Sequence, residues 1–203
     1  MPIDDHHRAP RRGRRRWAAM ALAGLATGVL TTGVLVTSAS PAWAAPSPIA
    51  GPTTGGTTVT DLVPGVTLTG LGQGGGNAGF GIGDDGRVYA WGFKDLLGNN
   101  AAGNSLTPVP VSLPTGVTVD QIAAGGAAYA LTDDGRIYAW GIGQNLGQLG
   151  AGGIVNAPTP VQVSSANVST GLFSDVSARN NTAYALGSDG LVYAWGMNNY
   201  GQI

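Results

Sequence analysis

Short apolar stretches alternate with turns rich in glycine and aspartate along most of this chain. One unit of the pattern is an apolar pair three residues apart, a run of small residues, a second apolar stretch, an Asp-Gly dipeptide and a third apolar stretch. Asp-Gly between two apolar runs predicts a β-hairpin, because glycine accepts the positive φ that such turns need. The apolar pairs are Leu68 and Leu71, Val119 and Ile122, and Phe173 and Val176.

The most regular part of the unit is an octapeptide that occurs three times. Its glycines Gly86, Gly135 and Gly190 are 49 and 55 residues apart, and a period near fifty indicates a protein built from stacked repeats. We interpret the recurring positions as structural residues of the repeat. They are Asp85, Gly86, Tyr89, Trp91 and Gly92; Asp134, Gly135, Tyr138, Trp140 and Gly141; and Asp189, Gly190, Tyr193, Trp195 and Gly196.

The end of the octapeptide predicts a strand that is covered on both faces. Strand geometry puts Val88 and Ala90 on one face and Tyr89 and Trp91 on the other, so both faces are apolar. A blade of a β-propeller has this environment, because it lies between two neighbouring sheets. Helices are not expected in the repeats, since 31 of the 159 residues from Ala45 onward are glycine. The predicted fold is therefore all-β, a partial β-propeller of about three blades.

The order of these elements resembles the regulator of chromosome condensation (RCC1-like) repeat. The octapeptide, the Gly-Gln-Leu-Gly loop at 147–150 and the proline-spaced stretches at 108–111 and 158–161 carry the resemblance, which covers residues 67–203. It implies a seven-bladed propeller, of the type found in extracellular bacterial members of the family. The chain departs from the family pattern at Ala127 and Thr182, where histidine is usual, and at Arg179, where glycine is usual. Because three blades cannot close a propeller, we expect the last repeat to be truncated and further repeats to follow.

The N-terminal residues have the composition of an export signal. Six arginines within the first sixteen residues precede an apolar stretch at 17–36, and an A-x-A site predicts cleavage between Ala44 and Ala45. We assign residues 1–44 to a signal peptide, 45–58 to a linker rich in Pro, Gly and Thr, and 59–203 to the repeats. The protein is then secreted or on the cell surface, by the general or the twin-arginine route. Membrane contact is expected only during export, or through an uncleaved anchor, since the apolar stretch is long enough to span a bilayer.

The charge distribution argues against a nucleic-acid partner. Residues after Ala44 include four basic side chains and nine aspartates. Nucleic-acid binding needs a basic patch that neutralises phosphates, and this segment has the opposite sign.

The side chains needed for most enzyme chemistry are also missing from the predicted mature segment. It has no cysteine and no glutamate, and the two histidines, His6 and His7, lie in the leader. We therefore expect no catalytic residues, no cofactor and no metal site. Calcium binding by the Asp-Asp-Gly turns is disfavoured, because the third copy replaces the first aspartate with Ser188.

Candidate binding residues lie in the loops that differ between repeats. The recurring Tyr and Trp side chains are better explained as core. We predict an exported or cell-surface β-propeller scaffold for protein or ligand binding or adhesion, whose partner is an unknown protein or surface ligand. Two alternatives stay open: a secreted propeller that inhibits an enzyme, like the β-lactamase inhibitors, and a non-catalytic module of a larger secreted enzyme. The candidate loop residues are Phe93, Lys94, Gln144, Asn145, Asn198, Asn199 and Tyr200.

Overall fold

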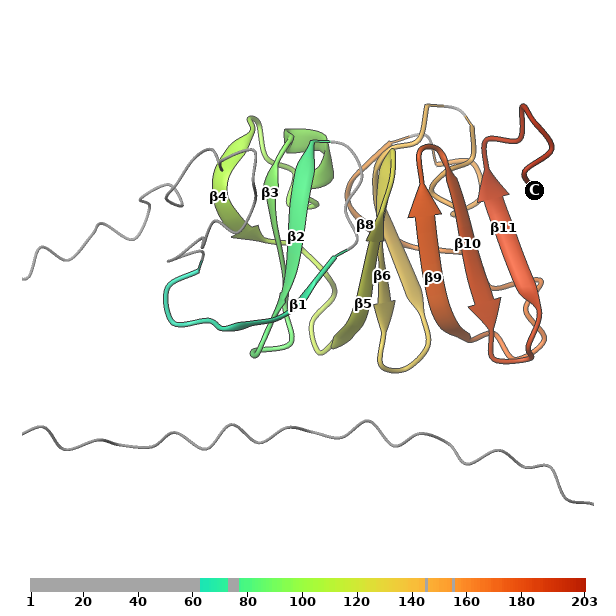
Figure 1. Ribbon diagram of the computed structural model, residues 1–203, viewed down its shortest axis with the longest axis horizontal. Coiled ribbons are helices and arrows are strands. Elements are labelled where there is room, and N and C mark those ends of the chain that lie inside the picture. The colour runs from blue at the N-terminus through green and yellow to red at the C-terminus, as the bar shows by residue number, and fades with distance from the viewer. Residues whose placement is uncertain (1–62, 73–76, 145, 155) are drawn as a thin grey trace, which may run out of the picture. The chain divides into compact units, whose positions relative to one another are not determined.

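The computed structural model describes residues 63–72, 77–144, 146–154 and 156–203, which form three antiparallel β-sheets (Figure 1). The predicted signal peptide, its cleavage site and the linker at 45–58 lie outside these residues. The first sheet contains β1 (Leu68–Leu71), β2 (Ala78–Gly83), β3 (Val88–Gly92) and β4 (Ser105–Pro110). The second contains β5 (Val119–Ala124), β6 (Ala127–Thr132), β7 (Ile137–Ile142) and β8 (Asn156–Gln162). The third contains β9 (Phe173–Arg179), β10 (Thr182–Gly187) and β11 (Val192–Gly196).

Each sheet is a meander in which strands that follow one another in sequence pair side by side. The Asp-Gly turns connect the second and third strands of every sheet, and Gly86, Gly135 and Gly190 have φ values of 75°, 83° and 85°. A residue with a side chain rarely adopts this conformation, so the hairpins predicted from Asp-Gly are confirmed. Among the described residues the single helical element is a short 3₁₀ turn, η1 (Lys94–Leu96), which confirms the all-β fold class.

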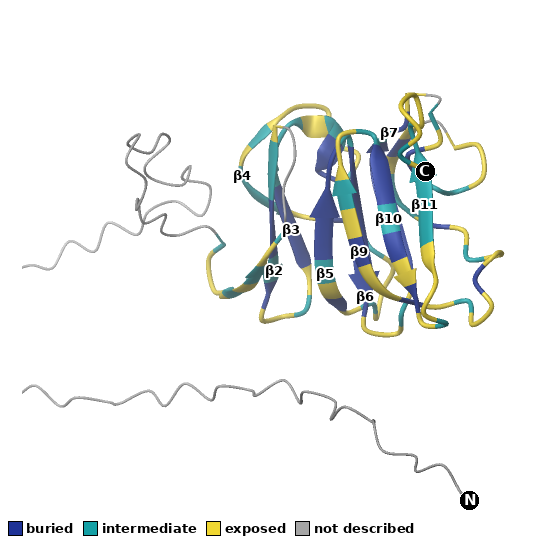
Figure 2. Cartoon of the chain, turned by 45° about the vertical axis from the view of Figure 1, so that its right-hand side comes forward, coloured by how far each residue is buried: buried dark blue, intermediate teal, exposed yellow. Residues whose placement is uncertain are grey.

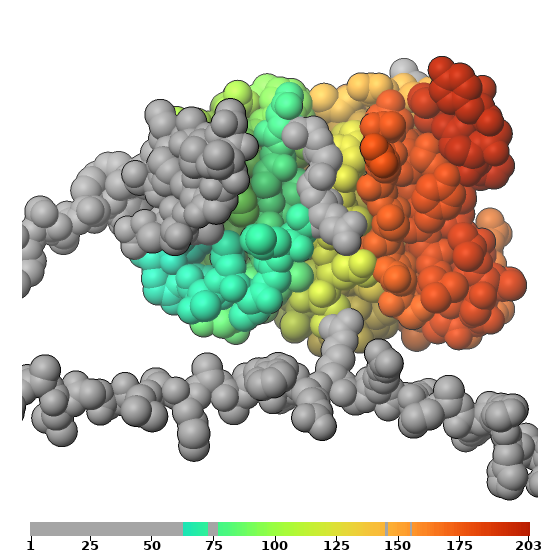
Figure 3. All heavy atoms as spheres, viewed as in Figure 1, coloured from blue at the N-terminus to red at the C-terminus, as the bar shows by residue number. Residues whose placement is uncertain are grey.

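The three sheets stack face to face in chain order, as blades of a partial propeller. Strand β5 contacts β2 on one side and β9 on the other, and the coloured segments of the three sheets adjoin one another in the space-filling view (Figure 3). One buried cluster, which includes Phe80, Val88 and Trp140, lies between the first two sheets. A second cluster, which includes Tyr129 and Val176, lies between the second and third sheets. Burial is therefore concentrated between blades (Figure 2).

The fourth strand of each complete sheet lies at the sheet's edge and carries two prolines. Strand β4 contains Pro108 and Pro110, strand β8 contains Pro158 and Pro160, and each of these strands pairs with one neighbour in the described structure. Proline has no N–H to donate to a ladder, so it is tolerated at an edge and disfavoured in a central strand. Proline placement thus marks the outer end of the meander.

No helix in the part of the chain that the structure describes is long and apolar enough to cross a bilayer. The apolar stretch at 17–36, for which we left an uncleaved anchor open, lies outside that part.

Candidate binding rim and the contacts between blades

The candidate loops come together at one end of the strands, which we call the loop rim. Because the strands alternate in direction, the connections after β3, β7 and β11 share this end with the β5–β6 and β9–β10 hairpins (Figure 1). The Asp-Gly turns lie at the opposite end. The loop rim comprises the described residues of 93–104, 143–154 and 197–203, with the hairpins at 124–127 and 179–182.

The first candidate loop begins directly after β3. Phe93 is partly buried and Lys94 is exposed. The backbone N–H of Lys94 donates to Oδ1 of Asn104 at 3.0 Å, and its Nζ lies 2.8 Å from Oδ1 of the adjacent Asp95. The ammonium group is therefore paired within its own loop, at the surface, where such a pair contributes little to stability.

The second and third candidate loops carry exposed polar and aromatic side chains. Gln144 is exposed and has a φ of 44°, while Asn145 lies outside the described residues. Asn198, Asn199 and Tyr200 are all exposed. Oδ1 of Asn198 accepts a hydrogen bond from the backbone N–H of Ile203 at 2.9 Å, so that side chain shapes its own loop.

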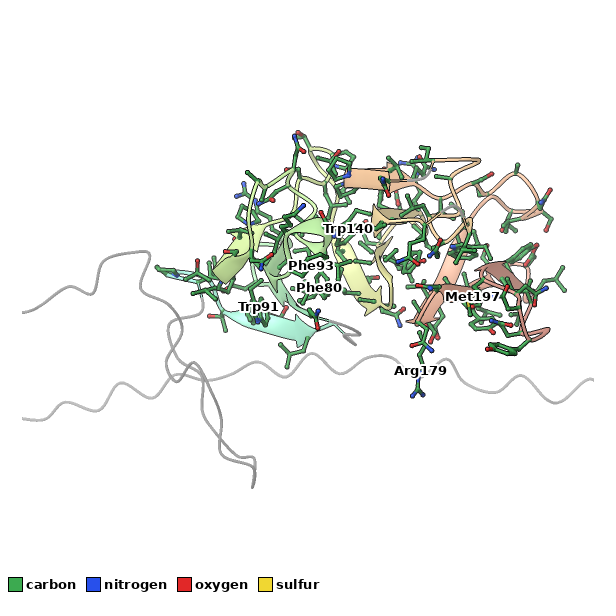
Figure 4. All side chains as sticks on the ribbon, turned by 90° about the horizontal axis from the view of Figure 1, so that it is seen from above. Phe80, Trp91, Phe93, Trp140, Arg179 and Met197 are labelled. Atoms are coloured by element: carbon green, nitrogen blue, oxygen red, sulfur yellow. The ribbon has the colours of Figure 1, made fainter. Side chains whose placement is uncertain are left out.

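Two hairpin tips that were not predicted from the sequence complete the loop rim. The N–H of Gly126 donates to the backbone oxygen of Asn180, so the tip of the second blade touches that of the third. A Cβ at Gly125 or Gly126 would overlap Asn180 or Asn181, and glycine permits this close approach. The neighbouring Arg179 is exposed, and its side chain extends away from the ribbon (Figure 4). The Gly-Gly pair opposite Asn-Asn is the sequence signal that could have found this contact.

The tryptophans of the octapeptide connect neighbouring blades. Nε1 of Trp140 donates to the backbone oxygen of Leu96 in the first blade at 2.8 Å, and the indole packs edge-on against Phe80. In the same way, Nε1 of Trp195 donates to the backbone oxygen of Gln148 in the second blade at 2.8 Å. Trp140 is completely buried, whereas Trp195 and Trp91 are partly buried. Trp140 and Trp195 thus fill the space between sheets, beneath the loop of the preceding blade.

The octapeptide aspartates accept hydrogen bonds within their own turns, and Asp189 also accepts from the backbone N–H and the hydroxyl of Ser169. Oδ2 of Asp189 accepts from the Tyr193 hydroxyl at 2.8 Å, and Oδ1 accepts from the N–H of Leu191 at 3.1 Å. The Leu191 amide and the Tyr193 hydroxyl lower the pKa of Asp189 to about 2. In the second blade a hydrogen bond from the Thr132 hydroxyl, 2.5 Å from Oδ1, lowers the pKa of Asp134. Within the described ranges, no three His, Cys, Asp or Glu side chains come together as a metal site.

Two small cavities lie away from the candidate loops. One, of about 280 Å³, is lined by residues that include Arg87, Pro110 and Leu113. The other, of about 180 Å³, is lined by residues that include Val163, Val168 and Trp195. Neither cavity is lined by a candidate binding residue, so the candidate residues of the loop rim lie on the surface outside both cavities.

Family models identify the repeats. Two models of the regulator of chromosome condensation (RCC1) repeat match this sequence, one over residues 85–128 and 134–186 and the other over 173–202. The chain belongs to the RCC1 repeat family. The three octapeptides are thus the hairpins of RCC1 repeats, and the resemblance seen in the sequence is confirmed. A comparison with curated protein sequences finds no match.

Solved structures with the same arrangement of blades confirm the propeller fold. The chain is similar to the crystal structure of Kap60 bound to yeast RCC1 (Prp20), with 22% identity and a TM-score of 0.56. It is similar to human WBSCR16, with 20% identity and a TM-score of 0.57, and to Prp20p from Saccharomyces cerevisiae, with 23% and 0.54. Each comparison covers 64% of this chain, and 32%, 33% and 33% of the respective structures. The chain therefore spans about a third of their length, and these likenesses show the fold alone.

Proposed function

We propose that this RCC1-repeat chain is an exported or cell-surface scaffold that binds a protein partner through the loop rim. One observation carries the proposal: the connections that follow β3, β7 and β11, which differ between repeats, lie together at one end of the blades and expose polar and aromatic side chains. The repeated Asp, Tyr and Trp side chains are used instead within turns and between sheets. Repeat proteins commonly divide their residues in this way, with a constant core and variable loops on the binding face.

Structurally similar proteins support a protein partner. One of them is yeast RCC1 bound to Kap60, and another is Prp20p, studied with its binding to Gsp1p and histones. We transfer the general role, which is to bind proteins, and none of these partners. The predicted mature segment is acidic overall, so we do not propose a nucleic-acid ligand.

The chemistry of the loop rim suits a polar protein surface. Tyr200 and Arg179 are exposed there, and aromatic and arginine side chains are enriched in protein interfaces. The exposed Asn198 and Asn199 add hydrogen-bonding groups that adapt to different partners. We propose a non-enzymatic role, because the described part of the chain contains neither histidine nor cysteine and brings together no acidic cluster.

The binding role is tested with two matched double variants of the 203-residue chain. The rim variant is Lys94→Ala with Tyr200→Ser, and the control, at the opposite end of the blades, is Arg136→Ala with Leu191→Ser. All four side chains are exposed, so neither variant should unfold the blades. The probe is the surface-protein fraction of the producing cells, crosslinked to the purified chain and identified by mass spectrometry. We expect the rim variant alone to lose the partner; equal crosslinking by both variants would rule out the loop rim.

Export is tested separately by sequencing the N-terminus of the protein produced by those cells. The arginine-rich segment, the apolar stretch and the A-x-A site support cleavage after Ala44. A mature chain that begins at Ala45 is the expected result. A retained leader in the membrane fraction would support the anchored form, and uncleaved protein in the cytosol would contradict export.

A further inference from the structure

One side chain at the interface between the second and third blades has buried polar atoms without a partner. Gln148, in the loop after β7, is 0% exposed. Within the described part of the chain, neither its side-chain nitrogen Nε2 nor its side-chain oxygen Oε1 makes a hydrogen bond. Buried polar groups in folded proteins are nearly always hydrogen-bonded, because burial removes the bonds that they make to bulk water. The amide of Gln148 therefore needs a partner that the neighbouring residues do not supply.

The third blade shows how the same glutamine is satisfied by a hydroxyl. Gln148 and Gln202 are equivalent, because the backbone oxygen of each accepts from a tyrosine hydroxyl of its own blade, at 2.5 and 2.6 Å respectively. Nε2 of Gln202 donates to Oγ1 of Thr182 at 3.4 Å, and that hydroxyl donates to the backbone oxygen of Met197 at 2.8 Å. Oε1 of Gln202 accepts from the N–H of Tyr200 at 2.9 Å. Both amide atoms thus have a partner in this blade.

The second blade lacks the hydroxyl that bonds to the nitrogen. Strand register places Ala127 opposite Gly141, as it places Thr182 opposite Gly196, so Ala127 occupies the position of the threonine. Ala127 is buried, and alanine has neither the Oγ1 nor the Cγ2 of threonine. This buried position therefore lacks the two side-chain atoms that occupy it in the third blade.

The second blade also lacks the donor that bonds to the side-chain oxygen. Leu146 lies two residues before Gln148, as Tyr200 lies two residues before Gln202. The N–H of Leu146 donates instead to the backbone oxygen of Gly143 at 2.9 Å. The differences at Ala127 and Leu146 account for the two unpartnered atoms of the amide.

The first blade has an apolar pair at the same two positions. Leu96 is the counterpart of Gln148, since the backbone oxygen of each accepts from the indole of the next blade at 2.8 Å. Ala78 lies opposite Gly92 and so takes the position of the threonine. Leu96 belongs to the buried cluster between the first two sheets, and Ala78 packs against that cluster. An apolar pair needs no hydrogen bond, so the second blade differs from both of its neighbours in burying an amide without its hydroxyl.

We propose that the second blade contains a binding site for a buried water molecule, at the place that the Thr182 hydroxyl takes in the third blade. The water accepts from Nε2 of Gln148 and donates to the backbone oxygen of Ile142, which follows Gly141 as Met197 follows Gly196. A carbonyl has two lone pairs, so Ile142 can accept this bond beside one from its own strand pairing. A second water beside the first donates to Oε1.

Water is the occupant that the chemistry of this site favours. The missing partner of Nε2 is a single hydroxyl oxygen that both accepts and donates, and water has the same two capacities. Buried waters in folded proteins typically make about three hydrogen bonds to polar groups that would otherwise be unpaired. Such a water is part of the structure and does not depend on the proposed binding role of the loop rim.

The direct test is a crystal structure of the 203-residue chain at a resolution that shows ordered water. The expected result is a water oxygen roughly 2.7–3.2 Å from Nε2 of Gln148. In the Ala127→Thr variant the new hydroxyl should take that place, and the water should be gone. A wild-type structure in which Nε2 bonds to a protein atom, or has no water within that distance, would overturn the proposal.

A double-mutant cycle measures the same contact in solution, from the urea midpoints of unfolding. Ala127→Thr should raise the midpoint by roughly 0.3–0.5 M, the effect of one hydrogen bond in a chain of this size. In the Gln148→Leu background, which copies the apolar pair of the first blade, the new hydroxyl has no amide to bond and should lower the midpoint.

Equal shifts in the two backgrounds would mean that position 127 and the amide do not interact, which would contradict the site. Circular dichroism checks that each variant retains its sheets. If Ala127→Thr does not fold, the wild-type crystal structure decides the question alone.

Discussion

The second and third blades contain the same octapeptide and differ in what lies beside them. Trp140 and Trp195 make the same hydrogen bond of 2.8 Å to the preceding blade, yet Trp140 is completely buried and Trp195 is only partly so. Ile137 is buried and its counterpart Val192 is exposed. The burial of a repeat residue is therefore set by the neighbouring sheet, and the stability of the array is a sum of blade and interface contributions.

The largest effect is expected from removing the indole that is covered on both sides. Trp140→Ala should lower the free energy of unfolding by roughly 3–5 kcal/mol, the usual range for a buried aromatic side chain. Trp195→Ala should lower the free energy of unfolding by about 2 kcal/mol, because folding removes less of this side chain's surface from water. Urea denaturation followed by far-UV circular dichroism measures both. Equal losses at the two positions would contradict the dependence of burial on the neighbouring blade.

Two glycines in the loop after β7 can be compared to separate the cost of backbone strain from the cost of disturbing a contact between blades. Gly150 has a φ of 62°, and a Cβ there would lie 2.8 Å from Nε1 of Trp195. Gly152 has a φ of 67°, and nothing lies within 4 Å of the Cβ position. Gly152→Ala should cost about 1 kcal/mol through backbone strain alone.

Gly150→Ala should cost roughly 2–3 kcal/mol, because the indole must also shift. The same denaturation experiment measures both alanine variants. If they were equally stable, the tryptophan contact would not constrain Gly150.

The repeat pattern was sufficient to predict the strands and their hairpins, because both depend on residues close together in sequence. The Asp-Gly turns, the two apolar faces of β3 and the lack of long helices in the described repeats follow from local rules. The gathering of the candidate loops at one rim follows from strand alternation. The contact between Gly126 and Asn180 could not be predicted in this way, because it joins residues of different blades.

A glutamine clamp is another contact that local pattern could not reveal. Nε2 of Gln121 donates to the backbone oxygen of Val176 at 3.1 Å, and its Oε1 accepts from the N–H of Val176 at 3.2 Å. Gly70 occupies the equivalent position in the first blade, so the clamp exists at one of the two interfaces. Its existence depends on the reach of one side chain across two sheets.

Removing this clamp should leave the interface between the second and third blades without these two hydrogen bonds, as the interface between the first and second blades is. Gln121→Ala should destabilise the chain by about 1–2 kcal/mol, since it removes two hydrogen bonds at a partly buried site. The exposed neighbour Asp120→Ala is the control and should change stability by less than about 0.5 kcal/mol. Hydrogen exchange of the Val176 amide gives an independent measurement. An unchanged exchange rate in the Gln121 variant would contradict the clamp.

The smallest expected effect is a pH dependence of stability that comes from the Asp-Gly turn of the third blade. Hydrogen bonds lower the pKa of Asp189 from 3.8 to about 2 in the folded chain. The stabilisation from its ionised form is therefore complete above about pH 4 and is lost as the pH falls from 4 to 2.

The effect should be modest, because Asp189 is only partly buried and solvent screens its charge. Asp189→Asn should remove this part of the pH dependence, as judged by urea midpoints at pH 5, 3 and 2. Parallel pH profiles for the variant and the wild-type chain would show that the turn bonds do not stabilise the folded state.

The backward direction of the tryptophan bond has a consequence for how such a chain is made. Trp140 and Trp195 each reach an acceptor that precedes them in the sequence. During synthesis the N-terminal part emerges first, so the acceptor blade can close before its donor leaves the ribosome. Each new hairpin can then pack against a blade that is already folded. In a chain whose repeats share the same octapeptide, strands of different units could exchange partners, and this order of assembly favours the correct pairing.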